Sequence, residues 1–119
     1  MADEEKHHIV RTLKREYDEN ASKLRQLESQ KRMVESTLRR AAFTAAQLDE
    51  MPEDVATYRS VGKAYFLQPK AAIMSHLEEA VNGSDSELKK LNSSREALSK
   101  RQDGLRGELN ELISQLRRG

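Results

Sequence analysis

The amino-acid sequence predicts a mainly α-helical protein: an antiparallel coiled coil of two long helices with a single β-hairpin at the bend. Two unbroken heptad patterns, separated by one short segment rich in β-branched and aromatic residues, carry this prediction. Composition agrees with it, because only 24 of the 119 residues are Ile, Leu, Val or Phe. A compact globule needs more apolar volume than this, whereas a narrow helical seam does not. The length allows one domain, which we expect to span residues 1–119.

The first helix is expected over about residues 4–50. From Val10 to Leu48, positions of core type recur at alternating steps of three and four residues, which is the repeat of a coiled-coil seam. The other faces carry acidic and basic residues four apart, such as Glu28 with Arg32, and each such pair supports an exposed helix by roughly 0.2–0.5 kcal/mol. Pro52 ends the helix, because proline has no amide hydrogen to donate and restrains the residue before it.

A β-hairpin is expected over about residues 55–68. The segment contains Tyr58, Val61 and Tyr65, whose side chains favour extended structure. Gly62-Lys63 lies between the two halves and can form the turn. The sequence therefore predicts a single hairpin between the helices.

The second helix is expected over about residues 69–118. Core-type positions again recur at steps of three and four from Met74 to Leu116. Pro69 suits a first helical turn, where its missing donor costs little. Three glycines in this helix each weaken it by about 1 kcal/mol relative to alanine. Because the heptad phase continues across Asn82-Gly83, we expect a bend there rather than a loop.

The two heptad runs also predict how the helices pair. If residues whose numbers sum to about 122 face each other, every core position of one run meets a core position of the other. Leu48 then faces Met74, and the polar residues Asn20 and Gln102 share one layer. A matched amide layer would fix the register at some cost in stability.

No constellation of residues for catalysis or metal binding occurs, so we expect neither an enzyme nor a cofactor. The chain has no Cys, and His7, His8 and His76 cannot converge as metal ligands must. Neither a glycine-rich phosphate loop nor a nucleophile motif is present. Basic residues come as doublets among acidic ones, which argues against nucleic acid as a partner. The longest apolar stretch, residues 41–46, is far too short to cross a membrane.

The expected hairpin is the most informative surface. A two-stranded hairpin is marginally stable in water, and both of its edges offer unpaired amides and carbonyls. It could fold onto the helix ends. Alternatively, several chains could pool their hairpins into a shared sheet or barrel that hides both the edges and the aromatic side chains.

The segment MPEDVATYRSVGKAYFLQ, residues 51–68, resembles the β-type subunits of prefoldin, particularly those of eukaryotes. The fingerprint is an aromatic residue, two further residues, Val-Gly-Lys, an aromatic pair after one alanine, and Leu-Gln, ahead of a helix that carries Ala71-Ala72-Ile73. Helix lengths, the single hairpin and the total size also agree, so the resemblance covers essentially the whole chain. Pro69 stands where the family usually has a small polar or acidic residue.

The resemblance implies a single prefoldin-like domain that acts as a subunit of a cytoplasmic heterohexamer of α-type and β-type prefoldin subunits. Such complexes capture unfolded or nascent proteins, notably actin and tubulin, and deliver them to the cytosolic chaperonin without ATP. By position, the assembly residues would be Tyr58, Val61, Gly62, Tyr65, Phe66 and Leu67. The client-binding residues at the coiled-coil tips would be Ile9, Val10, Leu13, Leu109, Leu112, Ile113 and Leu116.

Both expected roles have a simpler alternative. The tips could be ordinary coiled-coil ends, although Ile9 and Ile113 lie beside the seam and widen its apolar stripe. The whole chain could instead be a structural coiled-coil tether or scaffold in which the hairpin only turns the chain.

Overall fold

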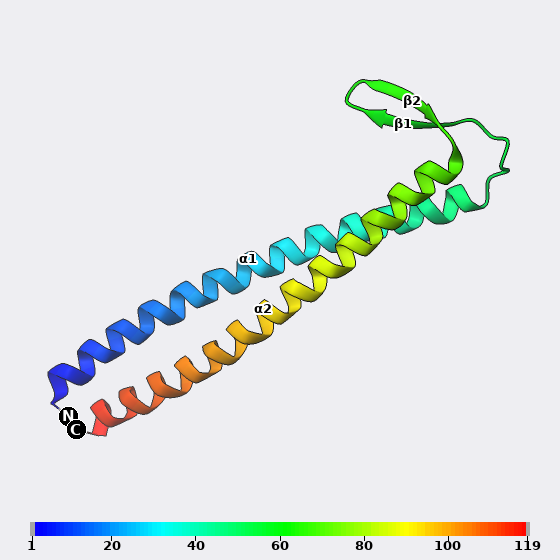
Figure 1. Cartoon of the computed structure of the whole chain (residues 1–119). Coiled ribbons are helices and arrows are strands. Elements are labelled where there is room, and N and C mark those ends of the chain that lie inside the picture. The colour runs from blue at the N-terminus through cyan, green and yellow to red at the C-terminus, as the bar shows by residue number, and fades with distance from the viewer. Residues whose placement is uncertain (1, 119) are drawn as a thin grey trace. The chain divides into compact units, whose positions relative to one another are not determined.

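The structure is a computed structural model that describes residues 2–118. Four elements follow one another along the chain: α1 (Asp3–Asp49), β1 (Thr57–Val61), β2 (Ala64–Gln68) and α2 (Lys70–Arg118) (Figure 1). The predicted fold class, two long helices with one antiparallel hairpin between them, is confirmed.

The chain divides into two compact units, and each is described by itself. Met1–Gln30 and Lys90–Gly119 make up the terminal unit, which contains the first part of α1 and the last part of α2. Lys31–Lys89 makes up the hairpin unit, which contains the rest of both helices and the hairpin.

In the terminal unit the two helices run side by side in opposite directions, so that the start of α1 lies beside the end of α2 (Figure 1). Leu13 and Leu105 are buried in this seam, and Leu105 is 0% exposed. Asn20 and Gln102 share the layer that the heptads predict, because the Asn20 Nδ2 donates to Gln102 Oε1 at 3.1 Å. The same amide donates to the backbone carbonyl of Leu98 at 2.9 Å. The predicted register is therefore confirmed in this unit.

The heptad positions form the covered face of both helices. Every predicted seam position except Arg95 is buried or partly buried. Arg95 instead forms an ion pair across the helices, with its Nε 2.8 Å from Glu28 Oε1. The expected pairing of Glu28 with Arg32 along α1 is thus replaced by a contact across the helices, since the opposite helix offers a closer guanidinium.

In the hairpin unit, β1 pairs antiparallel with β2 from Thr57 opposite Gln68 to Val61 opposite Ala64. Gly62 has a φ of 62°, and Lys63 has no positive φ. A positive φ at the first central residue alone is what a type II′ turn requires, and glycine adopts it without strain. The predicted turn is confirmed, whereas residues 55 and 56 precede the strand rather than belong to it.

One expectation for α2 needs correction, because Pro69 lies just before the first helical turn rather than within it. The helix begins at Lys70, and the carbonyl of Pro69 accepts hydrogen bonds from the amides of Ala72 at 3.0 Å and Ile73 at 3.3 Å. Pro69 therefore caps the helix from just outside its first turn. Helical structure continues through Asn82-Gly83, so no loop interrupts the heptads there.

One lysine joins the end of α1 to the start of α2. The last turn of α1 contains no basic residue of its own, and helix ends leave carbonyls unpaired. Lys70 Nζ supplies the cation: it donates to the carbonyls of Asp49 at 3.2 Å and Met51 at 2.9 Å and contacts Glu53 Oε1 at 3.3 Å. Its side chain is only 9% exposed. A positive charge at a helix C-terminus is favourable, so this contact stabilises the junction.

Candidate functional site

The hairpin carries a set of exposed apolar side chains, which we call the hairpin surface. It consists of Tyr58 (61% exposed), Val61 (53%), Tyr65 (74%), Phe66 (53%) and Leu67 (67%). These are five of the six residues expected to mediate assembly, and the sixth, Gly62, forms the turn. Large apolar side chains gathered on so short a segment are typical of a protein–protein contact surface.

The strand register divides these side chains between two faces of the hairpin. Cross-strand partners share a face, so Tyr58 lies with Leu67 on one face and Arg59 lies with Phe66 on the other. Thr57 belongs to the same face as Arg59 and is buried, at 8% exposure. Arg59 Nη1 lies 3.1 Å from Nε2 of His76 on α2. The face with Arg59 is therefore the one attached to the helices, and the opposite face presents its tyrosines to solvent.

Both long edges of the hairpin are also open. Within residues 2–118 the sheet has two strands only, so alternate amides and carbonyls on the outer side of each strand have no ladder partner. Such edges accept a further strand from another chain. The hairpin thus offers backbone pairing as well as apolar contact.

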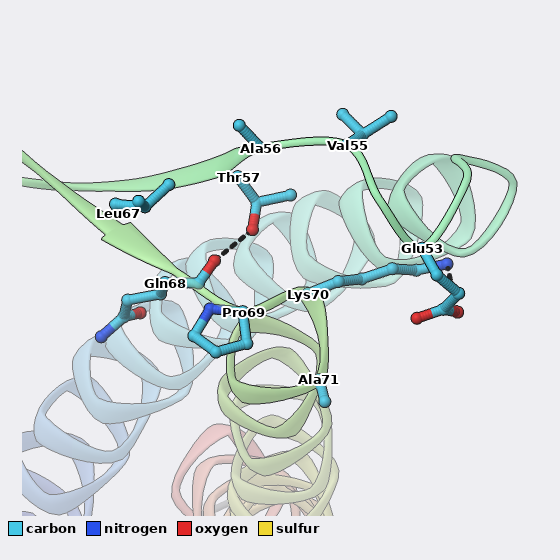
Figure 2. A pocket seen from close by; sticks show the side chains of 9 residues that line it. All are labelled: Glu53, Val55, Ala56, Thr57, Leu67, Gln68, Pro69, Lys70 and Ala71. Carbon is cyan, nitrogen blue, oxygen red and sulfur yellow. Dashed lines mark hydrogen bonds and ion pairs between the residues drawn. The ribbon is translucent and has the colours of Figure 1, made fainter.

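A cavity of about 450 Å³ lies at the base of the hairpin (Figure 2). Val55, Ala56 and Leu67 contribute apolar walls, and Lys70 crosses toward Glu53 along one side. The Thr57 hydroxyl donates to the carbonyl of Gln68, as Figure 2 shows. The side-chain oxygen of Gln68 is buried and has no hydrogen-bond partner among the residues described. A buried acceptor without a donor is destabilising by roughly 1–3 kcal/mol.

The residues expected at the coiled-coil tips all lie in the terminal unit, at the start of α1 and the end of α2. Leu13 is buried in the seam at 9% exposure. The other six are partly buried: Ile9, Val10, Leu109, Leu112, Ile113 and Leu116. The tip therefore offers apolar side chains that are half covered rather than fully exposed.

Two grooves of about 480 Å³ each flank the seam at the tip. Side chains that flank a heptad seam on opposite sides lie on different faces of the helix pair. The two grooves therefore lie on different faces of the tip. The basic-rimmed groove is lined by Val10, Lys14, Tyr17, Asp18, Arg106, Leu109, Asn110 and Ile113. The acidic-rimmed groove is lined by Ile9, Gly107, Glu108, Glu111 and Leu112. The Tyr17 hydroxyl accepts a hydrogen bond from Arg106 Nη2 at 3.3 Å, and this contact raises the pKa of Arg106.

The two units differ in how much apolar surface they expose. Among the residues described, all of the strongly exposed large apolar side chains lie in the hairpin unit. They include two on α1 that sequence analysis did not single out, Met33 at 69% and Phe43 at 63% exposure. Both stand outside the heptad positions, so a helical wheel identifies them as outward-facing.

The part of the chain described here has no group of three or more His, Cys, Asp or Glu side chains that could hold a metal ion. None of its helices is both long and apolar enough to span a membrane.

Comparison with known proteins agrees with this architecture. A family model of prefoldin subunits matches residues 12–116. Prefoldin subunit 1 of Arabidopsis thaliana is 30% identical over 115 residues, which is 97% of this chain and 90% of that protein. Prefoldin subunit beta of Methanothrix thermoacetophila is 30% identical over 90 residues, covering 76% of this chain and 75% of that protein.

A solved structure shares the fold. The crystal structure of the prefoldin beta subunit from Thermococcus strain KS-1 superposes with a TM-score of 0.81, covering 86% of this chain and 90% of that chain at 19% identity. With a family model over most of the chain and a relative at 30% identity over nearly all of it, the chain belongs to the prefoldin family of non-enzymatic chaperone subunits.

Proposed function

We propose that this chain is a β-type subunit of a cytoplasmic, heterohexameric co-chaperone that acts without ATP. The complex captures unfolded or nascent proteins of the actin and tubulin type and delivers them to the cytosolic chaperonin. Prefoldin subunits form complexes with one another, and residues 1–119 would act as one prefoldin-like domain in such a complex. The observation that carries the proposal is the hairpin surface, whose five large side chains are all more than half exposed.

Assembly through the hairpin follows from its energetics. Burying a large apolar side chain stabilises a complex by roughly 1.5–3 kcal/mol, and the hairpin surface offers five of them. A neighbouring strand would also pair the open edge of β1 or β2. The cavity beside Leu67 and the unpaired oxygen of Gln68 supply a place for an apolar side chain and an acceptor for a donor. A partner chain that fills this cavity with an apolar side chain and donates a hydrogen bond to Gln68 would remove both unfavourable features of the free chain, the empty cavity and the unpaired acceptor.

Client capture is assigned to the tip of the terminal unit. Ile9, Val10 and Ile113 line grooves whose apolar walls are only partly covered. One such groove binds weakly, but several arms held in one complex act at high effective concentration. Because each contact is weak, a client can dissociate without ATP hydrolysis, as an ATP-independent carrier requires.

Native mass spectrometry of the chain, alone and with candidate α-type and β-type partners, tests assembly. We expect a discrete heterohexamer that is lost in the double variant Tyr65→Ser, Phe66→Ser. The matched control is Phe43→Ser, because the exposure of Phe43, at 63%, lies between those of Phe66 and Tyr65, but Phe43 lies on α1 outside the hairpin. A stable monomer or homodimer of the unmodified chain in the presence of all partners would favour the tether or scaffold instead.

Suppression of aggregation of chemically unfolded actin, measured without ATP, tests capture. Polar substitution of Ile9, Val10, Ile113 and Leu116 should weaken suppression while leaving the hexamer intact. Loss of the hexamer with unchanged client binding would contradict the assignment of these residues to the tip site.

A further inference from the structure

We propose that the basic-rimmed groove binds client segments that carry a carboxylate beside apolar side chains, and that the acidic-rimmed groove on the other side of the tip rejects them. This inference rests on the proposed function and adds a charge preference to client capture. One tip would then receive acidic, apolar segments in a defined orientation.

The floor of the basic-rimmed groove supplies the apolar contact. Val10 and Leu109 are seam residues, and Ile113 stands beside the seam on the same side. All three are partly buried, so each retains surface that a client side chain can cover. This contact is not selective by itself, because burial of apolar surface has no direction.

The rim supplies the charge. Lys14 and Arg106 project from α1 and α2 onto the same groove, against a single acidic residue, Asp18. Among the residues described, Lys14 forms no ion pair. Its ammonium is therefore available to a carboxylate from another chain.

Arg106 is positioned for the same task. Its Nη2 donates to the Tyr17 hydroxyl at 3.3 Å, and its Nη1 lies 3.9 Å from Asp103 Oδ1. These contacts hold the guanidinium over the groove while its side chain stays 59% exposed. A guanidinium has five N–H donors, so several remain for a client carboxylate after these two contacts.

The acidic-rimmed groove provides the contrast within the same tip. Its floor is also apolar, from Ile9 and Leu112, but its charged lining consists of Glu108 and Glu111. Glu111 is partly compensated, since it accepts a hydrogen bond from Gln115 at 3.1 Å and lies 4.0 Å from Arg118. Glu108 has no such ion pair among the residues described. A carboxylate entering this groove would meet a like charge.

Fluorescence anisotropy with the chain of residues 1–119 tests the preference. Three labelled peptides share one apolar pattern and differ only in flanking residues, which are glutamate, lysine or glutamine. With the acidic rim removed by Glu108→Gln and Glu111→Gln, we expect the glutamate peptide to bind at low salt roughly three- to tenfold more tightly than the lysine peptide, from one or two exposed ion pairs at the basic-rimmed groove. The difference should shrink at 1 M salt, where the screening length falls to about 3 Å.

Variants locate the effect. Lys14→Gln and Arg106→Gln should each weaken the glutamate peptide about two- to fivefold and leave the glutamine peptide unchanged. The matched control is Arg15→Gln, because Arg15 follows Lys14 but lies on the exposed outer face of α1. Glu108→Gln should relax the rejection of the glutamate peptide by the opposite groove.

Each outcome decides a different point. Equal binding of the three peptides by the variant without the acidic rim, or glutamate-peptide binding that neither Lys14→Gln nor Arg106→Gln changes, would overturn the charge preference and leave apolar capture in place. Failure of every peptide, including the glutamine one, to bind would overturn client capture at this tip and the preference with it.

Discussion

A layer of two buried amide side chains joins α1 to α2 in the terminal unit. Asn20 and Gln102 are 6% and 7% exposed, and one hydrogen bond of 3.1 Å joins their side chains. Replacing Asn20 by leucine leaves the Gln102 amide without this partner, which is destabilising by about 1–3 kcal/mol. The added apolar burial opposes that loss by about 1.5–3 kcal/mol. We therefore expect Asn20→Leu to change the free energy of unfolding by no more than about 2 kcal/mol in either direction.

The double variant Asn20→Leu, Gln102→Leu separates pairing from burial. When both partners become apolar, no buried polar group is left unpaired, so the double variant should be more stable than the sum of the single changes by about 1–3 kcal/mol. Urea unfolding followed by circular dichroism measures this coupling. Asn92→Leu is the control, because Asn92 is an exposed amide on the same part of α2.

The double variant should also lose its unique register. Polar residues at seam positions specify register at the expense of stability, and an all-apolar layer permits the helices to slide. Because the chain has no Cys, cysteines at positions 16 and 101 can carry spin labels whose distance reports the pairing. We expect one distance in the unmodified seam and an additional one in the double variant. A coupling energy below about 0.5 kcal/mol together with one unchanged distance would refute the reasoning.

Three further predictions concern glycines and the helix junction. Gly62→Ala should destabilise the hairpin by about 1–2 kcal/mol, because its φ of 62° is unfavourable for alanine, although no atom beyond the neighbouring residues lies within 4 Å of the added carbon. Unchanged hydrogen exchange of the strand amides would argue against this. Lys70→Met should lower the free energy of unfolding by about 1–3 kcal/mol, because it removes the cation from two carbonyls. The control Lys63→Met, at the exposed turn, should not lower it. Equal melting temperatures of the two variants would contradict this. Gly104→Ala should stabilise α2 by about 1 kcal/mol, because the added carbon meets nothing within 4 Å; a lower midpoint in urea would show otherwise.

Much of the fold follows from local spacing. Heptad steps commit one face of each helix to burial, so the seam from Val10 onward and the layer of Asn20 with Gln102 are both predictable from the sequence alone. The hairpin is predictable for a similar reason, since a turn glycine between two extended segments leaves few other arrangements. These features depend either on residues that are close in the sequence or on the heptad spacing, which fixes the positions that pair between the two helices.

Other contacts depend on which side chains meet across elements. Glu28 has a basic residue four positions along its own helix, yet it bonds to Arg95 of α2. Lys70 completes the end of α1 from the next helix, with partners 19 and 21 residues away in the chain. No propensity or spacing rule singles out either contact, because the distance between charged groups is set only once the helices have packed.

The candidate surfaces also include features that the sequence predicts and features that depend on how the helices pack. The sequence by itself determined the helix–hairpin–helix order and the register, because both follow from periodicity and from turn chemistry. Only the tertiary structure decided that Leu13 is buried while Val10 is not, and that Lys14 and Arg106 share one groove while Glu108 and Glu111 share another. Lys14 and Arg106 are 92 positions apart in the chain, and only packing of α1 against α2 brings them to one side of the tip and the two glutamates to the other.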